Sequence, residues 1–207
     1  MGDDAALRRL MNAIAAADDA TALGLLGAVP ALTAAALQQG ATRASATENF
    51  LPEIAHHLYA GDTALHVASA AHRPDLARAL IERGADVGAR NRRGATPLHY
   101  AADGTPGAAR WNPADQAATI ALLIAAGADP NATDRSDVTP LHRAVRTRCA
   151  AAVGALLEGG ADPRRTNGNG STPAMLATRQ TGKSGSGTAE AKAQQAEIMG
   201  LFERHGL

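Results

Sequence analysis

Aromatic residues are scarce in this chain of 207 residues, which contains two Phe, two Tyr and one Trp. A core built almost without aromatic rings must consist of Ala, Leu, Ile and Val, and it suits closely packed small helices better than a large globular domain. Cysteine occurs only as Cys149, so an internal disulfide is excluded and a buried thiol in a helix is expected. No run of about 18 apolar residues is present. The N-terminal stretch also lacks the basic start of a secretory signal, so we expect a cytoplasmic protein that does not enter a membrane.

Net charge is also absent, because 20 basic residues are matched by 20 acidic residues. This balance favours no polyanionic partner. The charges are nevertheless distributed unevenly. Residues 1–89 carry 6 basic and 10 acidic groups, whereas residues 90–180 carry 11 basic and 7 acidic groups. The neutral total therefore conceals an acidic half and a basic half. High Ala and Arg content is also typical of a GC-rich bacterial genome.

A repeated hexapeptide organises the chain. Residues 61–66 read Gly-Asp-Thr-Ala-Leu-His, and related sequences follow at 94–99, at 137–142 and, more weakly, at 170–175. The spacings are 33, 43 and 33 residues. A second marker, Gly-Ala-Asp, occurs at 84–86, 127–129 and 160–162. Self-similarity at this period indicates a repeat architecture.

The chemistry of the two markers predicts where helices begin and end. Thr followed by Pro is a helix start, because the hydroxyl caps free N–H groups and Pro at the first helical position sacrifices no hydrogen bond. Gly after an aliphatic pair such as Leu80-Ile81 is a helix stop, since it adopts a left-handed conformation at low cost. Each unit is thus a short helix, a turn, a second helix and a polar loop. One unit cannot bury its own apolar face, so units must stack, with Leu65, Leu98 and Leu141 in one core.

These residues resemble the ankyrin repeat. The signature T-P-L-H-x-A appears at 96–101 and 139–144, and with Ala64 in place of Pro at 63–68. The resemblance covers about residues 58 to 207, and it implies an all-α fold, an ankyrin-repeat α-solenoid of helix pairs with β-hairpin-like finger loops. It also implies that His66, His99 and His142 are structural residues that bond backbone groups and join units.

The pattern divides the chain into one continuous solenoid. We predict a degenerate N-terminal capping helix pair at 4–28, a helical insertion at 29–57, repeat 1 at 58–90, repeat 2 at 91–133 with an insertion at 103–112, repeat 3 at 134–166, and repeat 4 with the C-terminal cap at 167–207 and an insertion at 181–192. Within 29–57, Phe50, Ile54 and Leu58 are spaced by four and predict a helix over 49–58. The insertions at 103–112 and 181–192 lengthen the same turn, so they should project from one edge, which is often a binding edge.

Catalytic motifs give no positive signal. The sequence Gly182-Lys183-Ser184 resembles the end of a phosphate-binding loop, but Ala177 occupies the position where that loop requires Gly. Glu53, His56 and His57 lie close together without a further ligand set. No nucleophile, base and orienting acid can be assembled. We therefore expect no enzymatic activity, no cofactor and no metal.

Arginines provide the candidate binding site. The predicted fingers and the helix faces that line the concave side contribute the residues that we call the basic stripe: Arg90, Arg92, Arg93, Tyr100, Arg135, Arg143, Arg146, Arg164, Arg165 and Arg179. Arginine is enriched at protein interfaces and pairs bidentately with carboxylates, so the expected partner is another protein with an acidic surface. An ordinary solvated surface, partly neutralised by Asp134 and Asp137, remains the competing interpretation. Nucleic acid is not expected, because Tyr100 alone could stack on bases.

Other functions remain open at this point. Trp111, in the 103–112 insertion, is either an anchor for its loop or an exposed binding residue. A small-molecule or enzymatic site could lie between the 30–58 insertion and the first unit, where it would need an apolar pocket with converging polar groups. A structural or oligomerising role is a third alternative. The leading expectation is a monomeric adaptor or scaffold.

Overall fold

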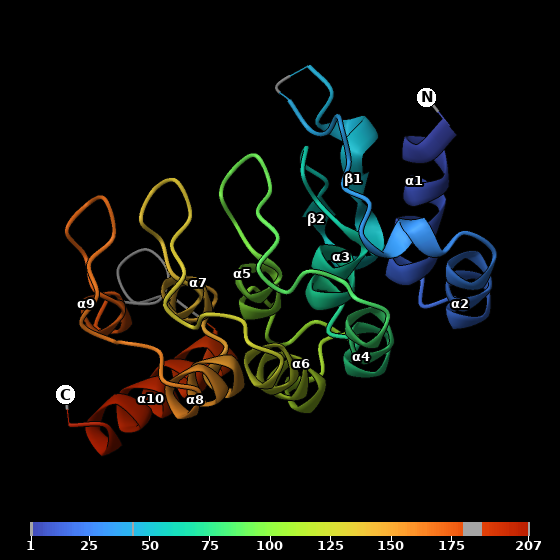
Figure 1. Cartoon of the computed structure of the whole chain (residues 1–207). Helices are drawn as coiled ribbons and strands as arrows, with labels where there is room; N and C mark the ends of the chain where they lie inside the picture. Colours follow the sequence, from blue (N-terminus) through green and yellow to red (C-terminus); the bar gives the residue numbers. More distant parts are fainter. Residues whose placement is uncertain (1, 43, 180–187, 207) are drawn as a thin grey trace.

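The computed structural model describes residues 2–42, 44–179 and 188–206 of the chain, which are mainly helical (Figure 1). The α-helices are α1 (Gly2–Ala15), α2 (Asp19–Ala28), α3 (Ala64–Ala70), α4 (Pro74–Glu82), α5 (Pro97–Ala102), α6 (Pro113–Ala125), α7 (Pro140–Thr147), α8 (Ala150–Glu158), α9 (Pro173–Ala177) and α10 (Ala189–Arg204). Shorter elements are the 3-10 turns η1 (Pro30–Thr33), η2 (Thr47–Asn49) and η3 (Pro52–Ile54) and the strands β1 (Phe50–Leu51) and β2 (His56–His57). In the described ranges, no helix combines the length and apolar character that crossing a bilayer would require.

Consecutive helices pack in pairs, and the pairs stack in two rows. Each odd-numbered helix contacts the even-numbered helix that follows it, from α1 with α2 to α9 with α10. Helices α1, α3, α5, α7 and α9 contact one another in sequence and form the first row; α4, α6, α8 and α10 do the same in the second row. Figure 1 shows the two rows with hairpin loops projecting from the side of the first row. The predicted all-α solenoid is therefore confirmed.

A repeated cap begins three helices of the first row. In each, the N–H of a Thr donates to Nδ1 of the His three residues later, at 3.1 to 3.2 Å. The pairs are Thr63 with His66, Thr96 with His99, and Thr139 with His142. Because Nδ1 accepts, the proton sits on Nε2, which donates to a backbone carbonyl of the next unit at 3.2, 2.9 and 2.9 Å. The structural role implied for these histidines is confirmed.

Three finger loops, at 86–95, 129–138 and 162–171, project beside the first row. A backbone hydrogen bond of 3.0 Å closes a turn within each loop. The Asn or Asp whose N–H donates this bond also accepts two backbone N–H groups with its side chain. Neighbouring fingers are bonded to each other: Arg135 N–H donates to Arg93 O, and Gly168 N–H donates to Ser136 O, both at 2.9 Å. These bonds hold the fingers in register, so side chains from different fingers keep fixed relative positions.

The core lies between the two rows of helices. Leu65, Leu98 and Leu141 from the first row are fully buried, as are Leu80 and Leu123 from the second row. They belong to one continuous cluster that runs from α1 to α10. The prediction of a single core shared by stacked units is confirmed. Since truncating a buried Leu to Ala costs about 2–5 kcal/mol, each unit depends on its neighbours for stability.

The expected helix over 49–58 is wrong. Pro52 lacks an N–H and disfavours the helical conformation of the preceding residue, so Leu51 is extended with φ −99° and ψ 98°. Strands β1 and β2 pair in an antiparallel hairpin, with Phe50 opposite His57 and η3 forming the turn. We call residues 48–58 the proline hairpin. The described part of 29–57 otherwise contains the 3-10 turns η1 and η2 and an isolated bridge from Ala36 to Thr63, so its described residues form no α-helix beyond the Val29 boundary.

The structure describes one of the other two predicted insertions fully and the second in part. Residues 103–112 connect α5 to α6, as the sequence spacing predicts. Of the insertion predicted at 181–192, residues 181–187 lie outside the described residues. Helix α10 begins at Ala189, so the last four predicted insertion residues belong to a helix instead. The helix pair predicted at 4–28 corresponds to α1 and α2.

Candidate functional site

Two adjoining clefts lie where the proline hairpin, the first-row helices and the 103–112 insertion meet. The large cleft has a volume of about 870 Å³ and the small cleft about 300 Å³. Ala55, His56, Tyr100 and Asp103 line both clefts. The two clefts are therefore neighbouring parts of one depression, with these four residues at their boundary.

The large cleft is lined mainly by small apolar groups. Its alanines come from the end of α1, the end of α3 and the insertion: Ala15, Ala16, Ala17, Ala70, Ala71, Ala108 and Ala109. Ile54 and Trp111 add larger apolar surfaces. The lining also contains polar and charged side chains: Glu53, His56, His72, Arg73, Tyr100, Asp103, Thr105, Arg110 and Thr147. A depression with both apolar and polar groups is suited to receiving a partner side chain or a small ligand.

Trp111 is held in place in this lining. Its indole Nε1 donates to Oε1 of the buried Gln116 at 2.8 Å. The amide of Gln116 in turn donates to the carbonyl oxygens of Ala101, at 3.0 Å, and Asp103, at 3.2 Å. Trp111 thus anchors its loop and also faces the large cleft. The two roles considered for Trp111 from the sequence, loop anchor and binding residue, are therefore compatible.

The small cleft is lined by charged groups. Arg93, Arg143 and Arg146 contribute guanidinium groups, and Asp103 is the one carboxylate among the lining residues that the structure describes. Arg146 is 62% exposed and its Nη2 lies 3.9 Å from the Asp103 carboxylate. Arg93 donates to the phenol oxygen of Tyr59 at 3.0 Å. The lining therefore has an excess of positive charge.

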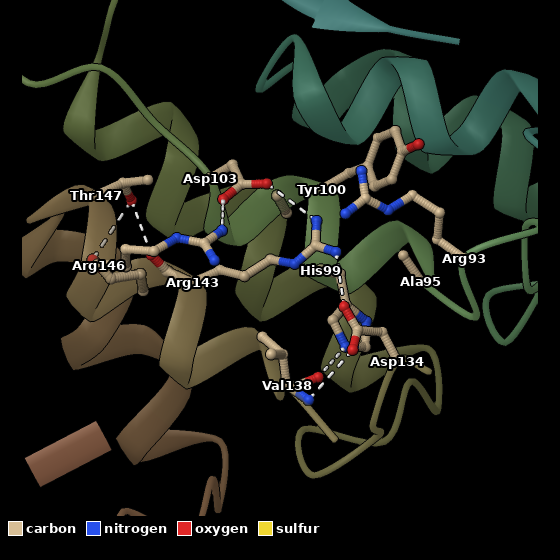
Figure 2. A network of polar contacts seen from close by, with 12 residues as sticks. Arg93, Ala95, His99, Tyr100, Asp103, Asp134, Val138, Arg143, Arg146 and Thr147 are labelled. Atoms are coloured by element: carbon tan, nitrogen blue, oxygen red, sulfur yellow. Dashed lines mark hydrogen bonds and ion pairs between the residues drawn. The ribbon is translucent and has the colours of Figure 1, made fainter. Parts of the chain in front are cut away.

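Arg143 is buried between two carboxylates, as Figure 2 shows. Its guanidinium donates to Asp103 at 3.0 Å and to Asp134 at 3.2 Å. Burial alone would lower the pKa of Arg143, but the two carboxylates raise it above its usual value. The pKa of Asp134 is lowered: burial would raise it, but the hydrogen bonds from Ser136 N–H and Arg143 outweigh that effect. Arg143 is therefore a charged residue that connects α5, α7 and the second finger.

A second polar network lies beneath the boundary of the clefts. The fully buried carboxylate of Asp62 accepts from the Tyr100 hydroxyl at 2.9 Å, from Asn91 Nδ2 at 2.8 Å and from Tyr59 N–H at 2.7 Å. Asn91 also donates to the Tyr100 oxygen at 2.9 Å. Burial, and then the negative charge of Asp62, hold the pKa of Tyr100 well above its usual value. The phenol is therefore a permanent donor to the buried carboxylate.

His56 covers this network at the cleft boundary. Its ring packs on Tyr100 with ring centroids 4.2 Å apart. Burial lowers the pKa of His56 to about 4, although the Asp62 carboxylate partly opposes this shift. At neutral pH the imidazole is uncharged and can donate or accept one hydrogen bond at each nitrogen. It therefore adds no charge to the depression.

The structure separates the residues of the basic stripe into two groups. Tyr100 and Arg143 are 2% and 8% exposed and use their polar atoms internally, so the expectation that they offer these groups to a partner is wrong. The physical reason is that buried Asp62 and nearly buried Asp134 require donors. The remaining members are exposed: Arg90, Arg92, Arg93, Arg135, Arg146, Arg164, Arg165 and Arg179.

Only Arg93 and Arg146 of these exposed arginines line the clefts. Others bond to groups of the chain itself: Arg90 to the Thr133 carbonyl at 2.7 Å, Arg164 to the Gly206 carbonyl at 3.1 Å, and Arg92 to the Ala41 carbonyl. Arg179 donates to the Ser171 hydroxyl at 3.3 Å. The basic stripe is thus spread along the fingers, and the clefts collect a small part of it.

Sequence reasoning missed Asp62, Asn91 and Asp103. A usable signal existed for Asp62, because the equivalent positions in the next two units are the apolar Ala95 and Val138. A charged residue at a position that is apolar elsewhere in a repeat indicates a local polar network. Asn91 and Asp103, in contrast, occupy loop positions where polar residues are ordinary.

Metal binding requires clustered ligands, and nucleophilic thiol chemistry requires an ionised thiol. Within the part of the chain that the structure describes, no group of three or more His, Cys, Asp or Glu side chains could hold a metal ion. Burial raises the pKa of the Cys149 thiol to about 11, so it stays protonated at neutral pH.

Two family models match the chain. One, described as ankyrin repeats (many copies), matches residues 48–101 and 123–177, which together are more than half of the chain. The other, described as ankyrin repeat, matches residues 93–135. No curated protein matches the chain. The matched ranges contain the three Thr–His caps and all three fingers, but not Ala15–Ala17 in the lining of the large cleft.

Proposed function

Since the chain belongs to the ankyrin-repeat family, whose members are generally protein-interaction modules, we propose that it is an adaptor or regulatory scaffold that binds another protein. The binding surface is the first-row face beside the fingers, with the two clefts at its centre. No covalent chemistry is required of the chain in this role.

The two adjoining clefts are the observation that carries this proposal. They are formed jointly by α1, the proline hairpin, three consecutive units and the 103–112 insertion. A depression assembled from so many elements is available only in the stacked solenoid, and it offers both apolar and charged groups. Specific interfaces have an apolar centre and a polar rim, and the combination found here fits that description.

The exposed arginines of the fingers extend this surface. Arg93, Arg135 and Arg165 lie on the first, second and third finger, and Arg135 N–H donates to Arg93 O. Positive groups along one edge accelerate the encounter with an acidic partner and suppress binding of basic ones. We assign this steering role to the fingers and the holding role to the clefts.

Affinity capture from cell extract, read out by mass spectrometry, tests the proposal. The wild-type chain is compared with a double variant, Arg93→Glu and Arg146→Glu, and with the matched control Arg78→Glu on α4 in the second row. Proteins retained by the wild type and by the control should be depleted at least tenfold with the double variant. Equal capture by all three chains would rule out the cleft face, and absence of any specific capture would count against the adaptor role.

A small-molecule site in the large cleft is the second candidate. Its volume of about 870 Å³ lies within the range of roughly 300–1,000 Å³ that is usual for ligand sites. Its position against the proline hairpin and the first unit also agrees with the alternative derived from the sequence. A thermal-shift screen of small molecules tests this candidate. A ligand supports it only if it raises the Tm of the wild-type chain and does not raise the Tm of the Ala108→Phe variant, in which Phe fills the cleft. An oligomerising role would instead appear as a concentration-dependent mass in light scattering.

A further inference from the structure

We propose, on the basis of the adaptor function above, that the two clefts form one two-part docking site for a partner segment carrying a bulky apolar side chain next to an acidic one. The apolar side chain enters the large cleft and the carboxylate enters the small cleft. The proposal specifies the chemistry of the partner, which the family does not.

The large cleft selects an apolar group because of its lining. Alanines from α1, α3 and the insertion leave space that larger residues would fill, and Ile54 and Trp111 supply apolar surface. The Trp111 indole is already fixed by its hydrogen bond to Gln116, so little side-chain freedom is lost when a ligand packs on it. A Phe, Trp or Leu side chain can bury apolar surface against these alanines, Ile54 and Trp111.

The small cleft selects a negative group because of its charge. Three guanidinium groups face one carboxylate, that of Asp103, among the lining residues that the structure describes. Arg143 is buried and pairs with Asp103 and Asp134. Arg93 and Arg146 are exposed, although Arg93 donates to Tyr59 and Arg146 lies 3.9 Å from Asp103, so a ligand can reach these two guanidinium groups. A carboxylate between two guanidiniums accepts charge-assisted hydrogen bonds, whereas an ammonium group would be repelled. The positive excess is therefore complementary to Asp or Glu.

The geometry places both groups on one segment. Ala55, His56, Tyr100 and Asp103 line both clefts, so the two clefts meet along the same four residues. Neighbouring Cα atoms along an extended chain are about 3.8 Å apart. The two anchoring side chains should therefore lie within two positions of each other in the partner sequence.

Selection from a display library of random ten-residue peptides tests this proposal on the whole chain. Selected peptides should carry Asp or Glu within two positions of Phe, Trp or Leu. Trp111 is the only Trp of the chain, so a Trp-free selected peptide should change its fluorescence saturably. Replacing the acidic residue by Lys, or the apolar residue by Ser, should each weaken binding at least tenfold.

Variants of the chain provide the matched comparison. Arg146→Glu should weaken the selected peptide at least tenfold by reversing charge at the small cleft. Ala108→Phe should weaken it similarly by filling the large cleft, and Ala108 is exposed, so the fold should tolerate the change. Arg78→Glu, on the second row, should bind as the wild type does.

Three outcomes overturn the two-part site: no enriched peptides, enrichment without the acidic and apolar pair, or binding that neither cleft variant reduces. Capture of full-length proteins separates this failure from failure of the adaptor function. Specific capture that persists while the peptide prediction fails leaves the adaptor function intact and refutes the cleft assignment alone.

Discussion

The Tyr100 hydroxyl offers a sensitive test of the buried network beneath the clefts. Tyr100→Phe removes one oxygen atom and keeps the ring that packs against His56 and His66. The substitution leaves almost no cavity, because the lost atom is replaced by hydrogen. Its effect on stability therefore reports the hydrogen bonds of the hydroxyl rather than packing.

The expected magnitude follows from the partners that are lost. The hydroxyl donates to both Asp62 oxygens at 2.9 Å and accepts from Asn91 at 2.9 Å. Hydrogen bonds to charged groups contribute about 1.5–3 kcal/mol. Asp62 keeps two donors, Asn91 Nδ2 and Tyr59 N–H, so it is not left wholly unpaired. We expect the free energy of unfolding to fall by about 2 kcal/mol, or roughly 4–8 °C in Tm for a chain of this size.

Urea denaturation followed by circular dichroism at neutral pH measures this change. Tyr59→Phe is the matched control, because it deletes the same oxygen from a partly exposed phenol whose partner, Arg93, is solvated. The control should change the free energy of unfolding by less than about 0.5 kcal/mol. If Tyr100→Phe were as mild as the control, the buried Asp62 network would not be a stabilising feature.

Three further predictions address other parts of the fold. Burial lowers the pKa of His99 from 6.5 to about 3, so the unfolded state takes up a proton first. Below pH 6.5, His99 should contribute a loss of stability of about 1.4 kcal/mol per pH unit, in addition to the loss from His56, whose pKa is also lowered. His99→Gln should remove the His99 contribution from the slope measured by urea titrations at pH 7 and 5. Arg143→Leu should lower the free energy of unfolding by about 2–4 kcal/mol in the same assay, because two carboxylates lose their partner. Arg146→Ala should lower it by less than about 0.5 kcal/mol, because the Arg146 side chain is 62% exposed. Equal losses for the two variants would contradict the burial of Arg143 between its carboxylates. Gly61→Ala should lower Tm markedly, since φ is +87° and its Cβ would meet the Asn91 backbone at 2.7 Å, while Gly24→Ala on α2 should be neutral or stabilising by about 0.5–1 kcal/mol.

The candidate site was only partly predictable. The basic stripe includes Arg93 and Arg146, which line the small cleft because their repeat positions place them on a finger and on a first-row helix. It also includes Arg143 and Tyr100, whose burial depends on carboxylates from other units. Repeat position predicts which face a residue occupies, but it does not reveal which acid lies opposite it in the neighbouring unit.

The proline hairpin shows the same limit in the backbone. Spacing by four suggested a helix over 49–58, and that pattern was outweighed by Pro52 and by backbone bonds to other segments. Leu58 N–H donates to Asn49 O at 2.7 Å and Ala41 N–H donates to Leu58 O. Pro52 was visible in the sequence and disfavours a helical conformation at Leu51, so it argued against a helix that begins at Asn49.

The sequence by itself determined the features that recur in each unit and depend only on residues within that unit. Thr63, Thr96 and Thr139 cap a helix with a His three residues away, and Gly ends the following helix, so these signals act within a short stretch and recur. The tertiary structure alone decided the clefts, the hairpin and the burial of Arg143. Those features arise where segments distant in sequence meet, and their energy comes from contacts between units that no single repeat contains.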